Sequence, residues 1–194
     1  GRSPQYAAKC GQTRSRPQNA GPNRHMRLLK RLFQAPDRGA APMLYAGIVA
    51  RGREAHWYEA GQVPDTIDGR FDMIAAVLSL VLLRLEQDPQ AVPFSTHLTE
   101  VFIDDMDGQL RQIGIGDIVV GKHVGKMMGM LGGRLGAYRE ALAAGGFDEA
   151  LVRNLYRGEA PAPAALAHVE TELRALHAGL AGTPVATLIG GALA

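Results

Sequence analysis

Apolar residues recur at intervals of three or four positions along most of the chain after residue 25, and this spacing limits the fold more than any other feature. Phe71, Ile74, Leu78 and Leu82 form the clearest run. Such spacing places the apolar side chains on one face of an α-helix. No segment alternates apolar and polar residues between hairpin turns, as a half-buried strand would. We therefore expect an all-α protein, a single-domain irregular bundle of about six to eight helices.

Residues that start and stop helices divide this pattern into segments. Pro42 suits the first turn of a helix, Asp117 can cap the start of a long helix, and the glycine pair at 145–146 ends it. The predicted helices cover residues 26–33, 42–52, 66–85, 93–110, 117–144, 148–156 and 163–180. The residues after 180 are rich in Ala and Gly and support no prediction.

The most apolar stretch runs from Met73 to Leu83 and is interrupted only by Ser79. A helix that crosses a membrane needs about 20 apolar residues, so this stretch is too short to cross one. We expect it to form a buried core helix, and we expect membrane contact of the protein to be peripheral at most.

The first 25 residues differ from the rest of the chain. They carry five basic side chains and no acidic one, a net charge of +5. Because the whole chain carries +2, the net charge of residues 26–194 is −3. The basic pI therefore belongs largely to this segment, and we expect no DNA binding. Its Gly, Pro, Ser and Asn content predicts a disordered tail over residues 1–25, either appended or upstream sequence, before a helical domain over 26–194. An organelle presequence is the alternative, which the prolines disfavour.

An acidic run in residues 102–108 superficially resembles a calcium-binding loop. Placing Gly108 at the sixth position of such a loop puts Ile103 at the first and Gly114 at the twelfth, where oxygen ligands are required. The match fails, and we expect Asp104, Asp105 and Asp107 to lie on a solvated helix face.

Other catalytic or metal-binding patterns are also absent from the sequence. The histidines are scattered, and the single cysteine, Cys10, lies in the tail and excludes an intrachain disulfide. Nucleophile elbows, phosphate loops and dinucleotide fingerprints do not occur. We expect no enzyme activity, no metal and no cofactor.

Four glycines recur every fourth residue in the long predicted helix, at Gly121, Gly125, Gly129 and Gly133. Each glycine inside a helix costs about 1 kcal/mol relative to alanine. The stripe could allow tight packing inside the protein, reflect compositional drift, or form a shallow groove for a partner helix. The basic residues beside it, Lys122, Lys126 and Arg134, form either a partner-binding edge or a solvated one.

Two blocks of sequence are more specific than generic helix. They are VPDTIDGRFDM, Val63 to Met73, and DDMDGQLRQIGIGDIVVGKHVGKM, Asp104 to Met127. Together with FDEALVRNLYRG at Phe147 to Gly158, they resemble the ubiquinol–cytochrome c chaperone family, and the likeness spans about Tyr45 to Tyr156. The resemblance implies an all-α chaperone that binds newly made cytochrome b and supports its maturation into respiratory complex III.

The resemblance also implies partners and a location. Mitochondrial members work with a small partner protein and bind near the ribosomal tunnel exit, on the matrix side. A bacterial member would work in the cytoplasm, at the cytoplasmic face of the inner membrane. The family supplies no catalytic residues and no cofactor.

The motif residues have a physical interpretation beside the family one. Asp65 or Thr66 can cap the helix that follows, and Asp68 adds negative charge at its positive end. We expect Arg70 to pair with an acid of the run at 104–107, which would make the motif a structural clamp; the alternative is that Arg70 contacts the bound protein. The residues assigned to this structural motif are Asp65, Asp68, Gly69, Arg70, Phe71, Asp72, Asp104, Asp105, Asp107, Gly114, Gly116 and Asp117.

Three classes of function remain open from sequence. A chaperone should expose an apolar or small-residue surface, here the glycine stripe with its basic edge and Arg70. A haem- or lipid-binding carrier, the alternative, should enclose an apolar cavity. An enzyme should bring ionisable groups together in a cleft.

Overall fold

The computed structural model describes residues 39–112 and 117–193, without the side chains of 110–124. These two ranges contain helices joined by turns and loops and no strand, which confirms the all-α prediction. The helices are α2 (Ala40–Gly52), α3 (Ala55–Glu59), α4 (Ile67–Leu85), a 3-10 helix η1 (Pro89–Ala91), α5 (Val92–Gln112), α6 (Asp117–Ala144), α7 (Phe147–Asn154), α8 (Pro163–Gly182) and α9 (Val185–Ile189).

The chain divides into two units, residues 1–35 and 36–194, and every described residue belongs to the second. The predicted tail over 1–25 and the predicted helix over 26–33 lie outside the described residues. The division of the chain at residue 26 stays a prediction.

The predicted helices of the second unit lie close to where the structure has them. The long helix begins and ends at the predicted residues, 117 and 144, and the others shift by at most a few positions at their ends. Three short helices have no predicted counterpart: α3 and α9, of five residues each, and η1, of three. Segments that short contain too few residues to show a helical period.

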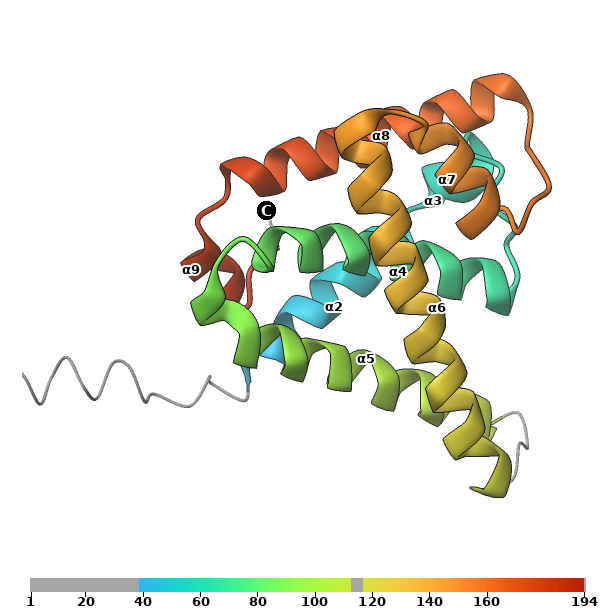
Figure 1. Cartoon of the computed structure of the whole chain (residues 1–194). Coiled ribbons are helices and arrows are strands. Elements are labelled where there is room, and N and C mark those ends of the chain that lie inside the picture. The colour runs from blue at the N-terminus through green and yellow to red at the C-terminus, as the bar shows by residue number, and fades with distance from the viewer. Residues whose placement is uncertain (1–38, 113–116, 194) are drawn as a thin grey trace, which may run out of the picture. The chain divides into compact units, whose positions relative to one another are not determined.

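Helix α4 forms the centre of this unit. Every residue from Met73 to Leu83 is buried, including Ser79, whose hydroxyl donates a hydrogen bond to the carbonyl oxygen of Ala75 at 2.7 Å. A helix that is apolar on all sides needs neighbours on all sides. Helices α2, α5, α6 and α8 pack around it (Figure 1). The predicted core helix is therefore confirmed, and no helix of the described ranges is long and apolar enough to cross a membrane.

Close packing of α2 on α4 depends on one glycine. A Cβ atom built on Gly52 would lie 3.0 Å from Cγ1 of Ile74 and 3.1 Å from its Cα. The absence of a side chain at Gly52 thus lets the end of α2 approach the backbone of α4. Two turns before Gly52 on α2, Tyr45 stacks edge-on against Phe102 of α5, with ring centroids 6.2 Å apart.

Candidate functional site

The first sequence block folds into the tight start of α4. The side chain of Thr66 accepts a hydrogen bond from the backbone N–H of Gly69 at 3.0 Å and so caps the helix. Of the two candidates for the cap, Thr66 fills the position, and the predicted capping role of Asp65 is wrong. A Cβ atom on Gly69 would overlap the carbonyl oxygen of Pro64, so this position requires glycine. Phe71, which begins the apolar run of this helix, is half-buried beside Phe102, at 5.7 Å between ring centroids.

Arg70 does not reach the acidic run of α5, and that predicted pairing is wrong. Its Nε donates to the Asp65 carboxylate at 2.6 Å, and both side chains are more than half exposed. The Arg70 guanidinium lowers the pKa of the Asp65 carboxyl through this hydrogen bond. Local geometry explains the difference, because Asp65 directly precedes the helix whose first turn carries Arg70. Arg70 is therefore a surface residue rather than a buried clamp.

A buried ion pair lies two positions further along α4, at Asp72. Its two carboxylate oxygens accept hydrogen bonds from Arg134 of α6 and from Arg157 after α7, both at 2.7 Å. Asp72 and Arg134 are 1% and 3% exposed, whereas Arg157 is about half exposed and also pairs with Asp68 at 2.7 Å. The hydrogen bond with Asp72 raises the pKa of Arg157. These four residues join the start of α4 to α6 and to the segment after α7.

Arg134 thus departs from its prediction as part of an exposed basic edge. It also donates to the carbonyl oxygen of Asn154. Its Nε and Nη1 and the hydroxyl of neighbouring Tyr138 are buried without a hydrogen bond to another described protein atom. Burial raises the pKa of Tyr138 to about 12. A spacing signal was present in the sequence, because Arg134 falls on the same helical stripe as the buried residues Leu131 and Tyr138.

The acidic run of α5 has separate roles for its members. Asp104 is exposed, as predicted for a solvated face, and Asp107 is half-buried and has an interaction partner. Asp105 departs from that prediction, because it accepts hydrogen bonds from the Tyr45 hydroxyl at 2.8 Å and from Gln109 at 3.2 Å, joining α5 to α2. Burial raises the pKa of Tyr45, and this hydrogen bond adds to the effect. Among residues 39–112 and 117–193, no three His, Cys, Asp or Glu side chains are placed to hold one metal ion.

The glycine stripe lies on an open face of α6. Cβ atoms added at Gly125, Gly129 and Gly133 would meet nothing within 4 Å, and the same holds at Gly132 and Gly136. Tight packing against another described helix is therefore excluded for these glycines, while drift and partner binding remain. Lys126 beside them is exposed. We call the face formed by Gly125, Gly129, Gly132, Gly133 and Gly136 the glycine face.

Several predicted residues lie outside what the structure describes. Gly114 and Gly116 fall in the gap at 113–116. The side chains of Asp117 and Lys122, and the surroundings of Gly121, are likewise not described. The backbone of α6 nevertheless begins at Asp117, where the sequence predicted a helix start.

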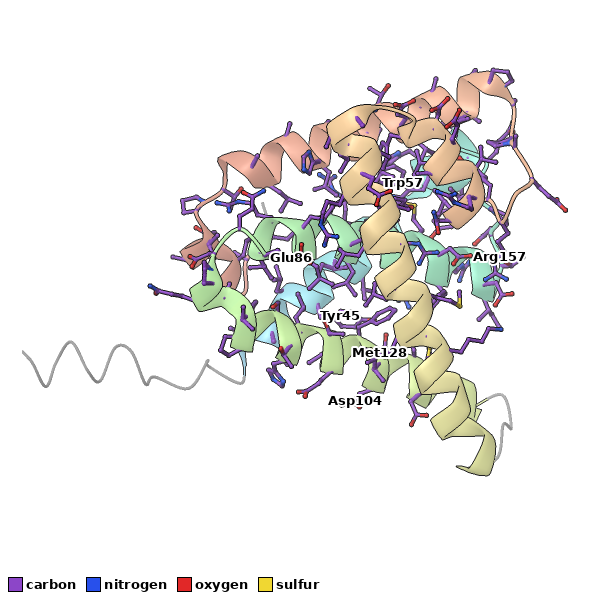
Figure 2. The ribbon with its side chains drawn as sticks, in the orientation of Figure 1. Tyr45, Trp57, Glu86, Asp104, Met128 and Arg157 are labelled. Carbon is purple, nitrogen blue, oxygen red and sulfur yellow. The ribbon has the colours of Figure 1, made fainter. Side chains whose placement is uncertain are left out.

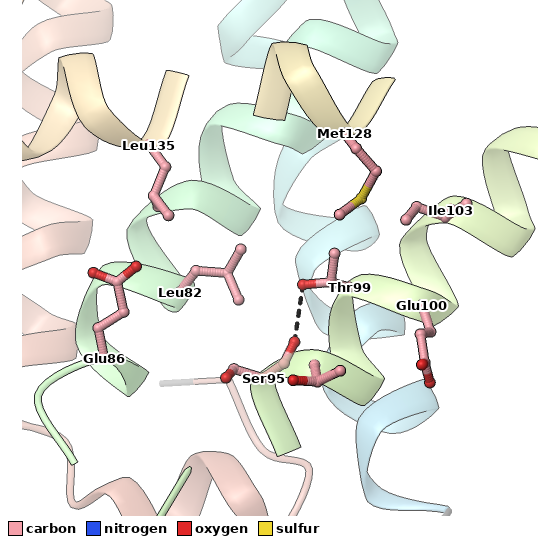
Figure 3. A pocket seen from close by; sticks show the side chains of 9 residues that line it. Leu82, Glu86, Ser95, Thr99, Glu100, Ile103, Met128 and Leu135 are labelled. Atoms are coloured by element: carbon pink, nitrogen blue, oxygen red, sulfur yellow. Dashed lines mark hydrogen bonds between the residues drawn. The ribbon is translucent and has the colours of Figure 1, made fainter. Parts of the chain in front are cut away.

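A hollow between α4, α5 and α6 was not predicted from sequence. It holds about 380 Å³, is open to solvent, and lies beside the glycine face because Met128 and Leu135 of α6 form one wall (Figure 3). We call it the α4–α6 groove; its lining residues are Leu82, Glu86, Ser95, Thr96, Thr99, Glu100, Ile103, Met128 and Leu135. Three helices far apart in the sequence build it, so no local pattern could have revealed it.

The hydroxyl groups of the groove donate hydrogen bonds to their own helix rather than to a bound molecule. Ser95 and Thr96 both donate to the carbonyl oxygen of Val92 at 3.0 Å. Thr99 donates to the carbonyl oxygen of Ser95 at 2.9 Å (Figure 3). Because their own helix satisfies them, the threonines offer mainly methyl groups to the groove. The surface is therefore more apolar than its residue types suggest.

A second polar cluster, also unpredicted, joins α3 to α8. Nδ1 of His56 lies 3.0 Å from Nε2 of His168, and Nε2 of His56 lies 3.0 Å from the Glu54 carboxylate. Glu54 in turn pairs with Arg51 at 3.2 Å. One ring nitrogen of each histidine bonds the other ring, so the nitrogens do not converge on a common point. The cluster therefore links α3 to α8 and does not surround a ligand.

Comparisons with known proteins agree with the resemblance read from the two sequence blocks. A profile of the ubiquinol-cytochrome C chaperone family matches residues 59–194, which extends the likeness beyond Tyr156. A crystal structure described as the Cbp3 homolog from Brucella abortus matches with a TM-score of 0.73 and 29% identity, covering 88% of this chain and 95% of that one. No curated protein sequence matches. With the matched residues spanning most of the helical unit, the chain belongs to the ubiquinol–cytochrome c chaperone family.

Proposed function

We propose that this protein is an assembly chaperone of respiratory complex III and that its client, the protein it binds during assembly, is newly made cytochrome b. The observation that carries the proposal is the family match over residues 59–194. A match of that length includes the core helix α4, the long helix α6 and the C-terminal helices, so it covers an architecture rather than a short motif.

The surface of the helical unit supports a binding role. The glycine face of α6 and the adjacent α4–α6 groove are open, and Met128 is 45% exposed beside them. Of the residues expected to contact a partner, Gly125, Lys126, Gly129 and Gly133 lie on or beside this open side. Arg70 is exposed at the start of α4 and is a further candidate contact.

The groups with shifted pKa values do not form a reaction centre. Tyr45, Tyr138 and Tyr156 have raised pKa values because they are buried. Burial also raises the pKa of Tyr58, which lines an open hollow with Asp65 and Arg70, and those two are shifted by each other. In that hollow the carboxylate and the guanidinium already bond each other, whereas a catalytic site leaves its perturbed groups to act on a substrate. We therefore propose a binding function without a catalytic step.

The carrier alternative receives no comparable support. A carrier of haem or lipid needs an enclosed apolar pocket, whereas the α4–α6 groove is open and has no histidine among its lining residues. Its acidic residues Glu86 and Glu100 would also repel the carboxylates of haem. We propose further that the protein acts at the cytoplasmic face of the inner membrane, with peripheral membrane contact at most, and that a small partner protein or the ribosome joins it.

The proposal can be tested by capturing the client in cells. A photo-crosslinking amino acid replaces Gly129 on the glycine face, and the matched control replaces Glu172, an exposed residue of α8. We expect an adduct with cytochrome b at position 129 and none at 172, identified by mass spectrometry after pulse labelling. A strain without the protein should accumulate less cytochrome b and less complex III. Normal complex III in that strain, together with adducts lacking cytochrome b, would contradict the proposal.

A further inference from the structure

The α4–α6 groove is lined by apolar side chains, one of which is a flexible, partly exposed methionine. Leu82, Ile103 and Leu135 come from three different helices and face the same hollow (Figure 3). Met128 also lines it and is 45% exposed. Methionine is unbranched and polarizable, so it adapts to varied apolar partners. A groove of this kind suits the apolar face of a helix, which inserts side chains spaced by three or four residues.

The charged residues around these apolar side chains are acidic. Glu100 lines the groove, and Asp104 follows it by one turn on the same side of α5. Glu86 lines the opposite end but is paired with Arg139 at 2.7 Å. Lys126 lies two positions before Met128, on the opposite flank of α6. Nδ1 of His97 lies 3.3 Å from the Glu100 carboxylate, and no lysine or arginine of the described residues pairs with Glu100 or Asp104. Negative charge is therefore concentrated on the α5 side of the groove.

Charge complementarity selects among the possible occupants. Membrane surfaces on the cytoplasmic side carry anionic headgroups, which the acids of α5 would repel. A helix that combines an apolar face with Lys or Arg residues satisfies both parts of the groove. Membrane proteins contain such segments in large number, because their cytoplasmic loops are enriched in Lys and Arg beside apolar helices.

We infer that the α4–α6 groove binds an apolar helical segment of the client together with its flanking Lys or Arg residues, with Met128 contacting the apolar face and Glu100 the basic flank. This inference rests on the proposed function, in which the client is a membrane protein. It adds the surface that is used and the kind of segment that is recognised. Complementary charge then sets which end of the client helix enters beside α5.

Two labelled peptides test the inference on the full chain. Both are soluble helices with the same leucine face; one carries three lysines at one end and the other carries three glutamates there. Fluorescence anisotropy should show at least ten-fold tighter binding of the lysine peptide, and the ratio should shrink as salt screens the exposed charges. Equal binding of the two peptides, or no saturable binding of either, would overturn the inference.

Two variants with matched controls locate the site. Met128→Glu should weaken binding of the lysine peptide at least ten-fold, and Met130→Glu, on the same helix but facing elsewhere, should change it less than two-fold. Glu100→Lys should reverse the preference between the peptides, and Glu172→Lys on α8 should not. Circular dichroism checks that each variant is folded. Equal loss in Met128→Glu and Met130→Glu, or Met128-dependent binding to anionic vesicles or to a second copy of this chain, would overturn the inference.

Capture in cells separates this inference from the proposed function. If the unmodified protein captures cytochrome b and Met128→Glu captures less, both are supported. If both proteins capture cytochrome b equally, the groove inference is wrong and the proposed function stands. If the unmodified protein captures none, the proposed function is wrong, and with it the assignment of the groove to that client.

Discussion

Asp72 of α4 and Arg134 of α6 form an ion pair that is almost completely removed from solvent, with 2.7 Å between Oδ1 and Nη2. Arg157 occupies the second carboxylate oxygen from the other side, also at 2.7 Å (Figure 2 labels Arg157). The two residues of the buried pair are 62 positions apart in the sequence, so the pair connects helices that only the folded chain brings together.

Removing Arg134 should destabilise the protein strongly. In Arg134→Ala the buried Asp72 carboxylate keeps Arg157 but loses its one buried arginine partner, and breaking a buried pair costs about 3–5 kcal/mol. Arg139→Ala is the matched control on the same helix, because its pair with Glu86 is about half exposed and should contribute less than about 1 kcal/mol. Denaturant unfolding monitored by circular dichroism measures both. Similar losses in the two variants would mean that the Asp72 cluster admits enough water to replace Arg134.

Alanine substitutions should have opposite signs at two glycines. Gly125→Ala should raise the free energy of unfolding by about 1 kcal/mol, because helix propensity improves and the added methyl meets nothing within 4 Å. Gly69→Ala should lower it by about 1–3 kcal/mol, since the methyl overlaps the Pro64 carbonyl. Thermal melts of the two variants give the signs directly. A destabilised Gly125→Ala would show that something packs on the glycine face in solution.

Arg70→Ala should leave the unfolding midpoint unchanged within error. The pair with Asp65 is exposed on both sides and therefore strongly solvated. Cytochrome b accumulation in cells gives the second measurement. If stability is unchanged and accumulation falls, Arg70 contacts the client; if stability falls by several degrees, the pair has a structural role that its exposure does not indicate.

Stability should fall at alkaline pH. Burial raises the pKa of Tyr138 to about 12 in the folded state, whereas the ordinary pKa of an exposed tyrosine is about 10. Above pH 10 the unfolded chain therefore binds fewer protons than the folded one, and stability is lost at up to about 1.4 kcal/mol per pH unit for each such group. Tyr45 and Tyr156 shift in the same direction.

Urea unfolding at a series of alkaline pH values measures this slope. Tyr138→Phe provides the control, because it removes one titrating group and a hydroxyl without a hydrogen bond to another described protein atom. The slope should become shallower in that variant. An identical slope would mean that Tyr138 ionises in the folded protein at its ordinary pKa.

Most of the helices could be predicted from sequence because their signals are local. The start at Asp117 and the end before the glycine pair at 145–146 are set by residues within one turn of each helix end. The core position of α4 was equally visible, since a stretch of eleven residues with a single polar side chain can only be buried or associated with a membrane. Local backbone preferences and burial of apolar surface do not depend on which helix is the neighbour.

The contacts between side chains of different helices could not be predicted from sequence, because the tertiary structure alone decides them. Arg134 has the spacing of a buried residue, but a charge is stable there only because Asp72, from another helix, faces it. Arg70 and Asp104, expected to be near partners, remain on the surface, and the α4–α6 groove exists only where three helices cross. Periodicity therefore fixes which face of each helix turns inward. The packing of large side chains and the pairing of buried charges fix how those faces are combined.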